Sequence, residues 1–445
     1  MSDPLTHQAA AGLAGETAAE TATDQSAGRA LPRALTPFRS ASYRKLAVAL
    51  VLQTFASGVW VVALVWEVIR IGGGAAQLSI VSTSAAVGIM LPLLIGGVVA
   101  DRIPQKSTLL VVATVELAGM SAATLLSLAD LTQVWHLATI SFVSGVGMAF
   151  YYPAYSAWLP AMIPEEDLMA VNGFEGMIRP TIGEAVGPGI AGVVVASASP
   201  ATAFAIAAIS SAAGVVALTA VPKTPVHRDL EDSEEHPVRA AMTDIAEGFR
   251  YMVRTGWLLA TLLFASLMIL VIMGPLEVLV PFLIKDKLGG GPSDHALVLV
   301  AFGVGSAIGA LAMASRPMPR RYLTVMNLMW GVGCLPFLVM GRTSHIWVVI
   351  ACGFVIGVLF SAPMVIWGTL LQRRVPMDLL GRVSSLDFFV SVSLMPVSMA
   401  LAGPVADAIG LRTTFLIAGV APTVFAVAAI VLWRLPEDEI AHPLS

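Results

Sequence analysis

The sequence has 445 residues, of which 57% are hydrophobic and only 12% are charged, and its formal net charge is −4. A soluble globular protein carries about 25% charged residues, so this chain has too few of them to cover a water-facing surface of its size. The charges are spread along the chain, without a basic stripe suited to nucleic acid. These properties exclude an ordinary soluble protein and a nucleic-acid-binding protein, and they predict an integral membrane protein.

The N-terminal segment, residues 1–44, is rich in alanine, threonine, glycine and glutamate. A secretory signal peptide needs a basic start followed by a continuous apolar stretch, and this segment has no such stretch. We therefore expect a disordered cytoplasmic tail.

Twelve apolar stretches follow, and each is long enough to cross a bilayer core of about 30 Å, which needs roughly 20 helical residues. They lie near residues 46–66, 78–100, 107–129, 135–162, 177–198, 201–221, 257–284, 296–315, 322–340, 347–371, 384–408 and 414–433. The predicted class is an all-α membrane protein with twelve transmembrane helices in two six-helix bundles, at 45–221 and 256–434. Most Lys and Arg residues then fall in cytoplasmic loops, which predicts that both termini, including the tail at 435–445, face the cytoplasm.

The one long internal loop, residues 222–255, joins the two predicted bundles and has a strongly charged middle. That charged run is expected to be a solvated linker. After it, Met242, Ile245, Phe249 and Met252 are spaced at helical intervals. This spacing predicts an amphipathic helix that lies in the membrane interface under the bundle.

The two predicted bundles share local sequence patterns in the same order, which indicates an internal repeat. In the fifth span Pro180 precedes Gly187–Pro188, and in the eleventh span Pro396 precedes Gly403–Pro404 by the same spacing. The first and seventh spans both end before three consecutive glycines. Such duplicated, pseudo-symmetric halves place a substrate site at their interface near the bilayer midplane and permit rocking between two access states.

The loop after the second span reads GGVVADRIPQK over residues 96–106. It resembles the signature cytoplasmic loop of the major facilitator superfamily, whose fold has two six-helix bundles. The resemblance implies a conformational latch made by Gly97, Asp101, Arg102 and Lys106, in which Asp101 faces the start of the eleventh span near residue 384. The alternative is a charge cluster that snorkels from a helix end.

The fifth span contains GEAVGPGIAG over residues 183–192, which resembles the antiporter motif of drug-exporting facilitators. Gly183, Gly187, Pro188 and Gly192 are the positions that match. The resemblance implies a hinge and seal, because small residues allow helix backbones to touch and proline bends a helix. The alternative is ordinary packing of small residues.

Residues 152–172 resemble the drug-exporter branch that includes macrolide efflux proteins and the enterobactin exporter. This resemblance implies a multi-pass transporter of the bacterial inner (plasma) membrane, acting as a monomer in secondary, proton-coupled multidrug efflux by alternating access. Its cargo would be amphipathic organic compounds or drugs. One departure concerns coupling, because Ser141 occupies the place where many proton-coupled facilitators have an arginine.

Ionisable residues within the spans are candidates for coupling or substrate contact, because a charge there costs about 2.5 kcal/mol or more. They are Glu184, Arg179, Glu116, Glu67 and Glu277. Arg179 follows Glu175 by four residues, so a local ion pair between them is a sufficient explanation of that charge. Glu184 lies roughly 140° around an α-helix from Arg179 and is not obviously neutralised by it. Asp387 is expected in the first turn of the eleventh span, where the helix dipole stabilises an acid.

Aromatic residues within the spans are candidates to line a cavity, although packing or lipid contact explains each of them equally well. They are Phe55, Trp60, Tyr151, Tyr155 and Trp367.

Two alternatives to a drug exporter remain at this point. The chain contains neither a phosphate-binding loop nor a metal-ligand spacing, so an enzyme, a cofactor and a bound metal are not expected. Export of one endogenous metabolite such as a siderophore is compatible with the same motifs. A membrane sensor or scaffold that transports nothing is the other alternative, and the intact latch and hinge motifs argue against it.

Overall fold

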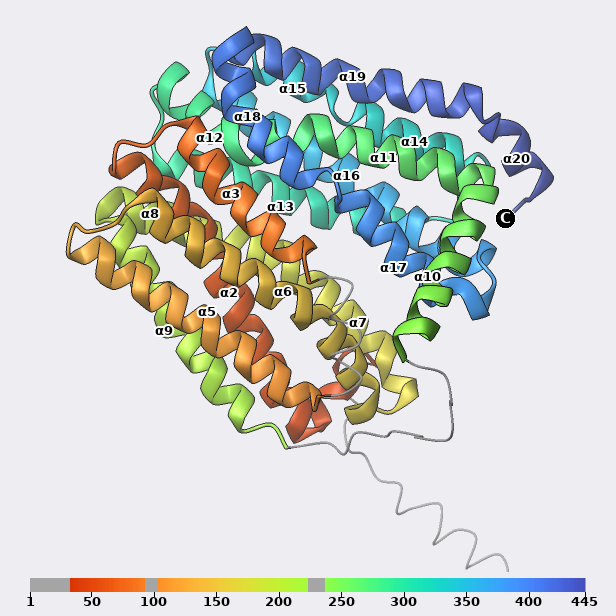
Figure 1. Ribbon diagram of the computed structural model, residues 1–445, viewed down its shortest axis with the longest axis horizontal. Coiled ribbons are helices and arrows are strands. Elements are labelled where there is room, and N and C mark those ends of the chain that lie inside the picture. Colours follow the sequence, from red (N-terminus) through yellow and green to blue (C-terminus); the bar gives the residue numbers. More distant parts are fainter. Residues whose placement is uncertain (1–32, 93–102, 223–236, 445) are drawn as a thin grey trace, which may run out of the picture.

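The computed structural model describes residues 33–92, 103–222 and 237–444. Within these ranges the regular structure is entirely helical, and the helices form two bundles that lie against each other (Figure 1). The predicted all-α membrane class is therefore confirmed.

The N-terminal bundle follows a short 3₁₀ helix and contains one helix that changes its winding. Its elements are η1 (Arg33–Arg39), α2 (Ala41–Arg70), α3 (Ala75–Met90), α5 (Gln105–Leu128), α6 (Val134–Met162), α7 (Glu165–Ile178), η2 (Arg179–Val186), α8 (Gly187–Ser197) and α9 (Pro200–Thr219). The segments α7, η2 and α8 are continuous, and η2 is π-helical.

The C-terminal bundle is preceded by a separate helix, α10 (Pro237–Arg254), within the predicted linker. Its elements are α11 (Gly256–Gly274), η3 (Pro275–Leu279), α12 (Val280–Phe282), η4 (Leu283–Lys287), α13 (Pro292–Ala314), α14 (Tyr322–Val332), α15 (Leu335–Met340), α16 (Ile346–Arg374), α17 (Met377–Val392), α18 (Met395–Ile409), α19 (Leu411–Leu432) and α20 (Leu435–Ala441). The eleventh predicted span therefore begins at Met377, earlier than the sequence pattern placed it.

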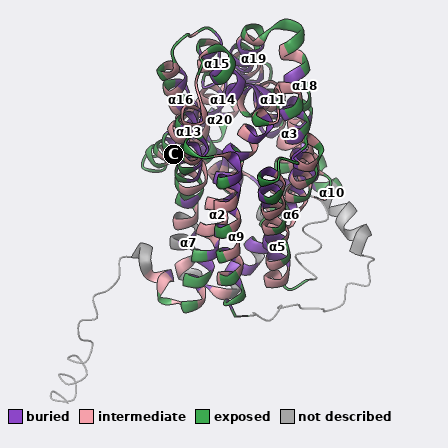
Figure 2. Ribbon diagram, turned by 90° about the vertical axis from the view of Figure 1, so that its left-hand side faces the viewer, coloured by how far each residue is buried: buried purple, intermediate pink, exposed green. Residues whose placement is uncertain are grey.

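Ten helices in the described ranges are long and apolar enough to cross a membrane. A further apolar helix, Ala75–Met90, is shorter, and the predicted fifth span is the composite of α7, η2 and α8. The total of twelve remains a prediction. Large apolar side chains such as Leu125, Ile209 and Trp347 are exposed, as a lipid-facing surface requires. Figure 2 shows how exposed and buried residues are distributed over the helices of the two bundles.

Glycine-mediated helix contacts repeat in the two bundles. In the first bundle, a Cβ atom on Gly145 of α6 would lie 2.2 Å from the Ala85 carbonyl oxygen of α3. In the second, a Cβ atom on Gly357 of α16 would lie 2.1 Å from the Phe302 carbonyl oxygen of α13. Only glycine allows backbones to approach this closely. The second and fourth spans of each half thus form the same kind of pair.

The two bundles approach each other closely where α3 and α13 begin. A Cβ atom on Gly192 of α8 would lie 2.2 Å from Ala296 Cβ of α13, and one on Gly403 of α18 would lie 2.7 Å from Ala76 Cα of α3. Ser79 Oγ also accepts a hydrogen bond of 3.0 Å from Gly403 N. From this end the two bundles diverge toward α7, α10 and α17 (Figure 1).

Candidate functional site

The fifth span changes its winding at the boundary between the bundles. Pro180 lies in the first turn of η2, and Pro188 lies in the first turn of α8. Because proline has no backbone N–H, it removes a hydrogen bond from the helix. Hydrogen bonds in a π-helix join residues five apart, so residues i and i+5 share one face of η2.

This winding brings Arg179 and Glu184 together, with 3.6 Å between Arg179 Nε and Glu184 Oε1. Arg179 Nη1 also donates a 3.0 Å hydrogen bond to the hydroxyl oxygen of Tyr152 on α6. Glu175, in contrast, accepts a hydrogen bond from the hydroxyl of Tyr155. The predicted pairing of Arg179 with Glu175 was therefore wrong, because it assumed α-helical spacing throughout the fifth span.

The glycines of the predicted hinge lie at crossings of η2 and α8 with two other helices. Toward α2, a Cβ atom on Gly187 would lie 2.9 Å from Gly58 Cα, and one on Gly58 would lie 2.6 Å from the Gly183 carbonyl oxygen. Toward α13 of the other bundle, Gly192 packs against Ala296, as described above. The small residues are thus required for packing against both bundles, and their role as a hinge stays a prediction.

The second bundle contributes an acid to the same boundary. Glu277 lies in η3, a second π-helical segment, and its side chain is exposed. Its charge interacts with that of Glu184 in the opposite bundle. On α13, a Cβ atom on Gly303 would lie 2.9 Å from the backbone carbon of Glu184, which fixes how closely η2 and α13 pack. Arg179, Glu184 and Glu277 therefore form a mixed-charge group between the bundles.

Glu67, a predicted candidate for coupling or substrate contact, forms an ion pair within the N-terminal bundle. Its side chain is fully buried and accepts hydrogen bonds of 2.8 and 2.9 Å from Arg70 Nε and Nη2. Arg70 Nη1 donates a further bond of 2.6 Å to Asp130 in the turn before α6. The pair joins the end of α2 to the end of α5, and Glu67 is not available to a cargo molecule.

Glu116 on α5 is half-buried. Its carboxylate interacts electrostatically with the Tyr151 hydroxyl on α6. Tyr151 stacks on Tyr155, with 5.7 Å between ring centroids and 8° between the ring planes. This cluster belongs to the interior of the N-terminal bundle. Whether Glu116 takes part in coupling stays a prediction.

The other predicted cavity aromatics also have packing partners. Trp60 lies 5.0 Å from the Phe204 ring, and Phe55 is half-buried against the core. Trp367 is only 6% exposed, and its indole N–H donates a 3.0 Å hydrogen bond to Asp387. Tyr155 is likewise buried, so Trp367 and Tyr155 do not line an open cavity in this conformation.

Asp387 lies ten residues after the first residue of α17, because that helix begins at Met377. The predicted stabilisation by the helix dipole is therefore wrong, since that effect is confined to the first turn. Hydrogen bonds from Trp367 Nε1 and from Ser391 Oγ stabilise the carboxylate instead. The hydropathy pattern gave no indication of these two hydrogen-bond donors.

Of the predicted latch, Gly97, Asp101 and Arg102 lie outside the described residues. Lys106 is described, and its Nζ donates hydrogen bonds to the carbonyl oxygens of Thr219, at 2.8 Å, and Val221. These contacts cap the C-terminal end of α9, where a cation is favourable. Ser141, at the place of the expected arginine, is buried against the helices of its own bundle.

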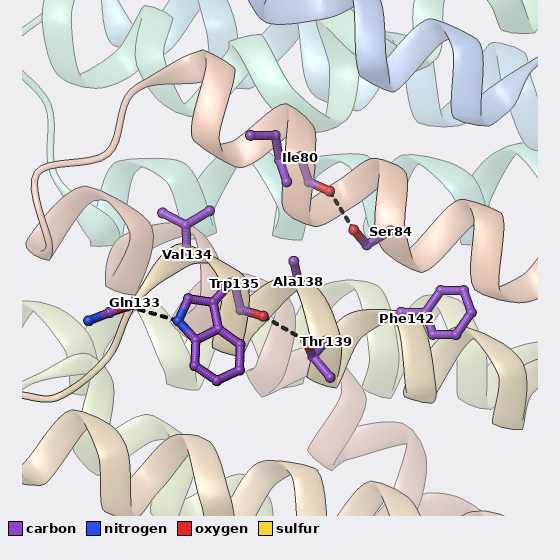
Figure 3. Close-up of a pocket in the computed structure, with 8 residues that line it drawn as sticks. All are labelled: Ile80, Ser84, Gln133, Val134, Trp135, Ala138, Thr139 and Phe142. Carbon is purple, nitrogen blue, oxygen red and sulfur yellow. Dashed lines mark hydrogen bonds between the residues drawn. The ribbon is translucent and has the colours of Figure 1, made fainter.

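A pocket of about 620 Å³ lies outside this mixed-charge group (Figure 3). Its lining comes from α3, α6 and the turn before α6, and includes Ile80, Ser84 and Trp135. The hydroxyl of Ser84 donates to a carbonyl of its own helix, and the indole of Trp135 donates to Gln133. All lining residues belong to the N-terminal bundle, so this pocket is not shared by the two halves.

A sequence profile described as "transmembrane secretion effector" matches residues 33–444. The chain is 26% identical over 400 residues to multidrug efflux pump Tap of Mycolicibacterium fortuitum, covering 86% of this chain and 94% of that protein. It is 25% identical over 333 residues to macrolide efflux protein A of Streptococcus pyogenes, and the match covers 73% of this chain and 79% of that protein.

Two solved structures share the fold. The nucleoside transporter NupG has a TM-score of 0.68 at 14% identity, covering 89% of this chain and all of that one. A POT family transporter has a TM-score of 0.65 at 18% identity, and the match covers 88% of this chain and 96% of that one.

Proposed function

The chain belongs to the transmembrane secretion effector family of the major facilitator superfamily, and from this premise we propose that it is a proton-coupled exporter of amphipathic organic compounds. The similarity to multidrug and macrolide efflux pumps over most of the chain is the observation that carries this proposal. The family is one of membrane transporters. This supports a role in transport, and we do not propose an enzymatic activity.

In the proposed cycle the two bundles rock against each other, and the glycine contacts between α8 and α13 and between α3 and α18 form in one state and separate in the other. The protein lies in a bacterial inner membrane as a monomer, with both termini and the linker at 222–255 in the cytoplasm. This orientation is supported by the distribution of Lys and Arg in the loops. The described conformation then has the bundles joined on the outer side.

Glu184 is the acid that we assign to coupling. It lies between the bundles on a π-helical segment, and such segments are frequent at functional sites. Its ion pair with Arg179 is loose, at 3.6 Å, and Arg179 is largely exposed. A proton or a cationic cargo can therefore compete with Arg179 for the carboxylate, which is the exchange that antiport requires.

Inverted membrane vesicles test the proposal. Addition of erythromycin or ethidium should dissipate an imposed proton gradient, reported by an acridine dye, in vesicles that contain the wild-type protein. Glu184→Gln should reduce the substrate-induced proton flux at least about tenfold, and Glu437→Gln, which changes an exposed acid, should not. Proton coupling is refuted if neither compound dissipates the gradient while both are still exported. The choice of Glu184 is refuted if its substitution leaves the flux unchanged.

A further inference from the structure

The helix α10 has two different exposed stripes beside the face that packs on the C-terminal bundle. Gly248 and Met252 are buried, whereas Phe249 and Val253 are 52% and 45% exposed. Phe249 was predicted to share one face with Met252, but the structure separates them. Arg250 and Arg254 each directly follow an exposed apolar residue, so the basic stripe lies about 100° around the helix from the apolar stripe.

The buried face of α10 is firmly attached to the C-terminal bundle. Glu247 Oε2 accepts a 2.6 Å hydrogen bond from Arg382 Nη1 of α17. A Cβ atom on Gly248 would lie 2.9 Å from Leu386 Cδ1, so the two helices are in close contact there. The Tyr251 hydroxyl donates a 3.3 Å hydrogen bond to the carbonyl oxygen of Arg374. The exposed face of α10 is thus held in a fixed orientation.

Arg250 and Arg254 are exposed. Unlike Glu247, which pairs with Arg382, neither forms an ion pair within the described part of the chain. Only Thr255 separates α10 from α11, which is a membrane-spanning helix. The C-terminal end of α10 therefore lies at the depth of the lipid headgroups, and in Figure 1 the helix crosses the ends of α11 and α17.

We propose that Phe249, Val253, Arg250 and Arg254 form a binding surface for anionic phospholipid. The two apolar side chains enter the acyl boundary, and the two guanidinium groups bind lipid phosphate, for which arginine has suitable geometry. Charge complementarity selects anionic headgroups over zwitterionic ones. Since α10 is joined to α17 by Glu247 and Gly248, lipid bound here holds the start of the eleventh span at the membrane surface.

The test compares the purified full chain in nanodiscs of phosphatidylcholine alone and of phosphatidylcholine with phosphatidylglycerol. Hydrogen exchange of the amides in residues 246–254 reports whether α10 is held against the membrane. The interaction of each arginine with an anionic surface corresponds to about a fivefold change in the binding equilibrium. Exchange in the wild type should therefore be slowed about fivefold or more by phosphatidylglycerol.

The double variant Arg250→Gln with Arg254→Gln should lose this slowing and keep the melting temperature of the wild type in phosphatidylcholine. The matched control is Arg316→Gln with Arg320→Gln, which removes the same charge from two exposed arginines in the loop after α13. The control should retain the slowing. Equal exchange of the wild type in the two lipids would overturn the proposal, and so would equal loss of the effect in both double variants.

Discussion

Replacing Gly192 by alanine should weaken the contact between the two bundles. The added Cβ atom would lie 2.2 Å from Ala296 Cβ, whereas two such carbons need about 3.5–4.0 Å. The helices α8 and α13 must then separate by roughly 1.3–1.8 Å. Overpacking of this kind typically costs about 1–3 kcal/mol, which corresponds to about a 5- to 140-fold change in an equilibrium constant. In a rocking transporter, the cost falls on the state in which the bundles meet at this end.

Electron paramagnetic resonance can measure that change as a distance distribution. Spin labels on cysteines introduced at Ser197, the last residue of α8, and at Asp407, near the end of α18, report the separation of the bundles at this end. The native Cys334 and Cys352 are buried, so they should not take up label. Gly192→Ala should shift the population from the short distance to a longer one.

The matched control is Gly176→Ala, because a Cβ atom at Gly176 of α7 would meet no other atom within 4 Å. This variant should leave the distance distribution as it is in the wild type. The reasoning is refuted if Gly192→Ala gives an unchanged distribution. It is also refuted if Gly176→Ala shifts the distribution equally, since the effect would then not come from the contact between α8 and α13.

Two further predictions concern buried acids outside the boundary between the bundles. Glu67→Gln removes a buried carboxylate from Arg70 and should lower the stability in detergent by about 1–3 kcal/mol, measured as a fall in melting temperature. The Glu67→Gln variant should still export substrate above the level of cells that lack the protein, because this acid is not placed at the cargo site. Loss of export with an unchanged melting temperature would contradict this assignment. Glu439→Gln should lower the melting temperature in the same way, because the buried carboxylate accepts two backbone N–H bonds. Glu437→Gln changes an exposed acid and should not lower the melting temperature. An equal fall in melting temperature for both variants would contradict the role of Glu439.

Much of the architecture could be predicted from the sequence, because hydropathy and repeated motifs are properties of segments. The helical class follows from the length of the apolar stretches. The glycines at 183, 187 and 192 were assigned to helix contacts because a small residue allows two backbones to approach, and the structure places Gly187 and Gly192 at such contacts. These inferences need no knowledge of which helix is the neighbour.

Side-chain pairing could not be predicted, because it depends on local winding and on neighbours distant in the sequence. Arg179 was assigned to Glu175 on α-helical spacing, and the π-helical turn places it against Glu184 instead. Asp387 was interpreted from an assumed helix start that the structure places at Met377. The segment at 435–445 was expected only to be a cytoplasmic tail, and no sequence pattern indicated that Glu439 of α20 contacts α14.

The contact of Glu439 with α14 has a consequence for biosynthesis. The first backbone N–H groups of a helix lack partners within it, and here Glu439 accepts hydrogen bonds from Leu323 N and Thr324 N. Leu323 and Glu439 are 116 residues apart, so at about 5–20 residues per second the ribosome needs roughly 6 to 23 s to synthesise the segment between them. Throughout that time the start of α14 is incomplete. The C-terminal bundle can therefore reach its final form only after Glu439 has left the ribosome.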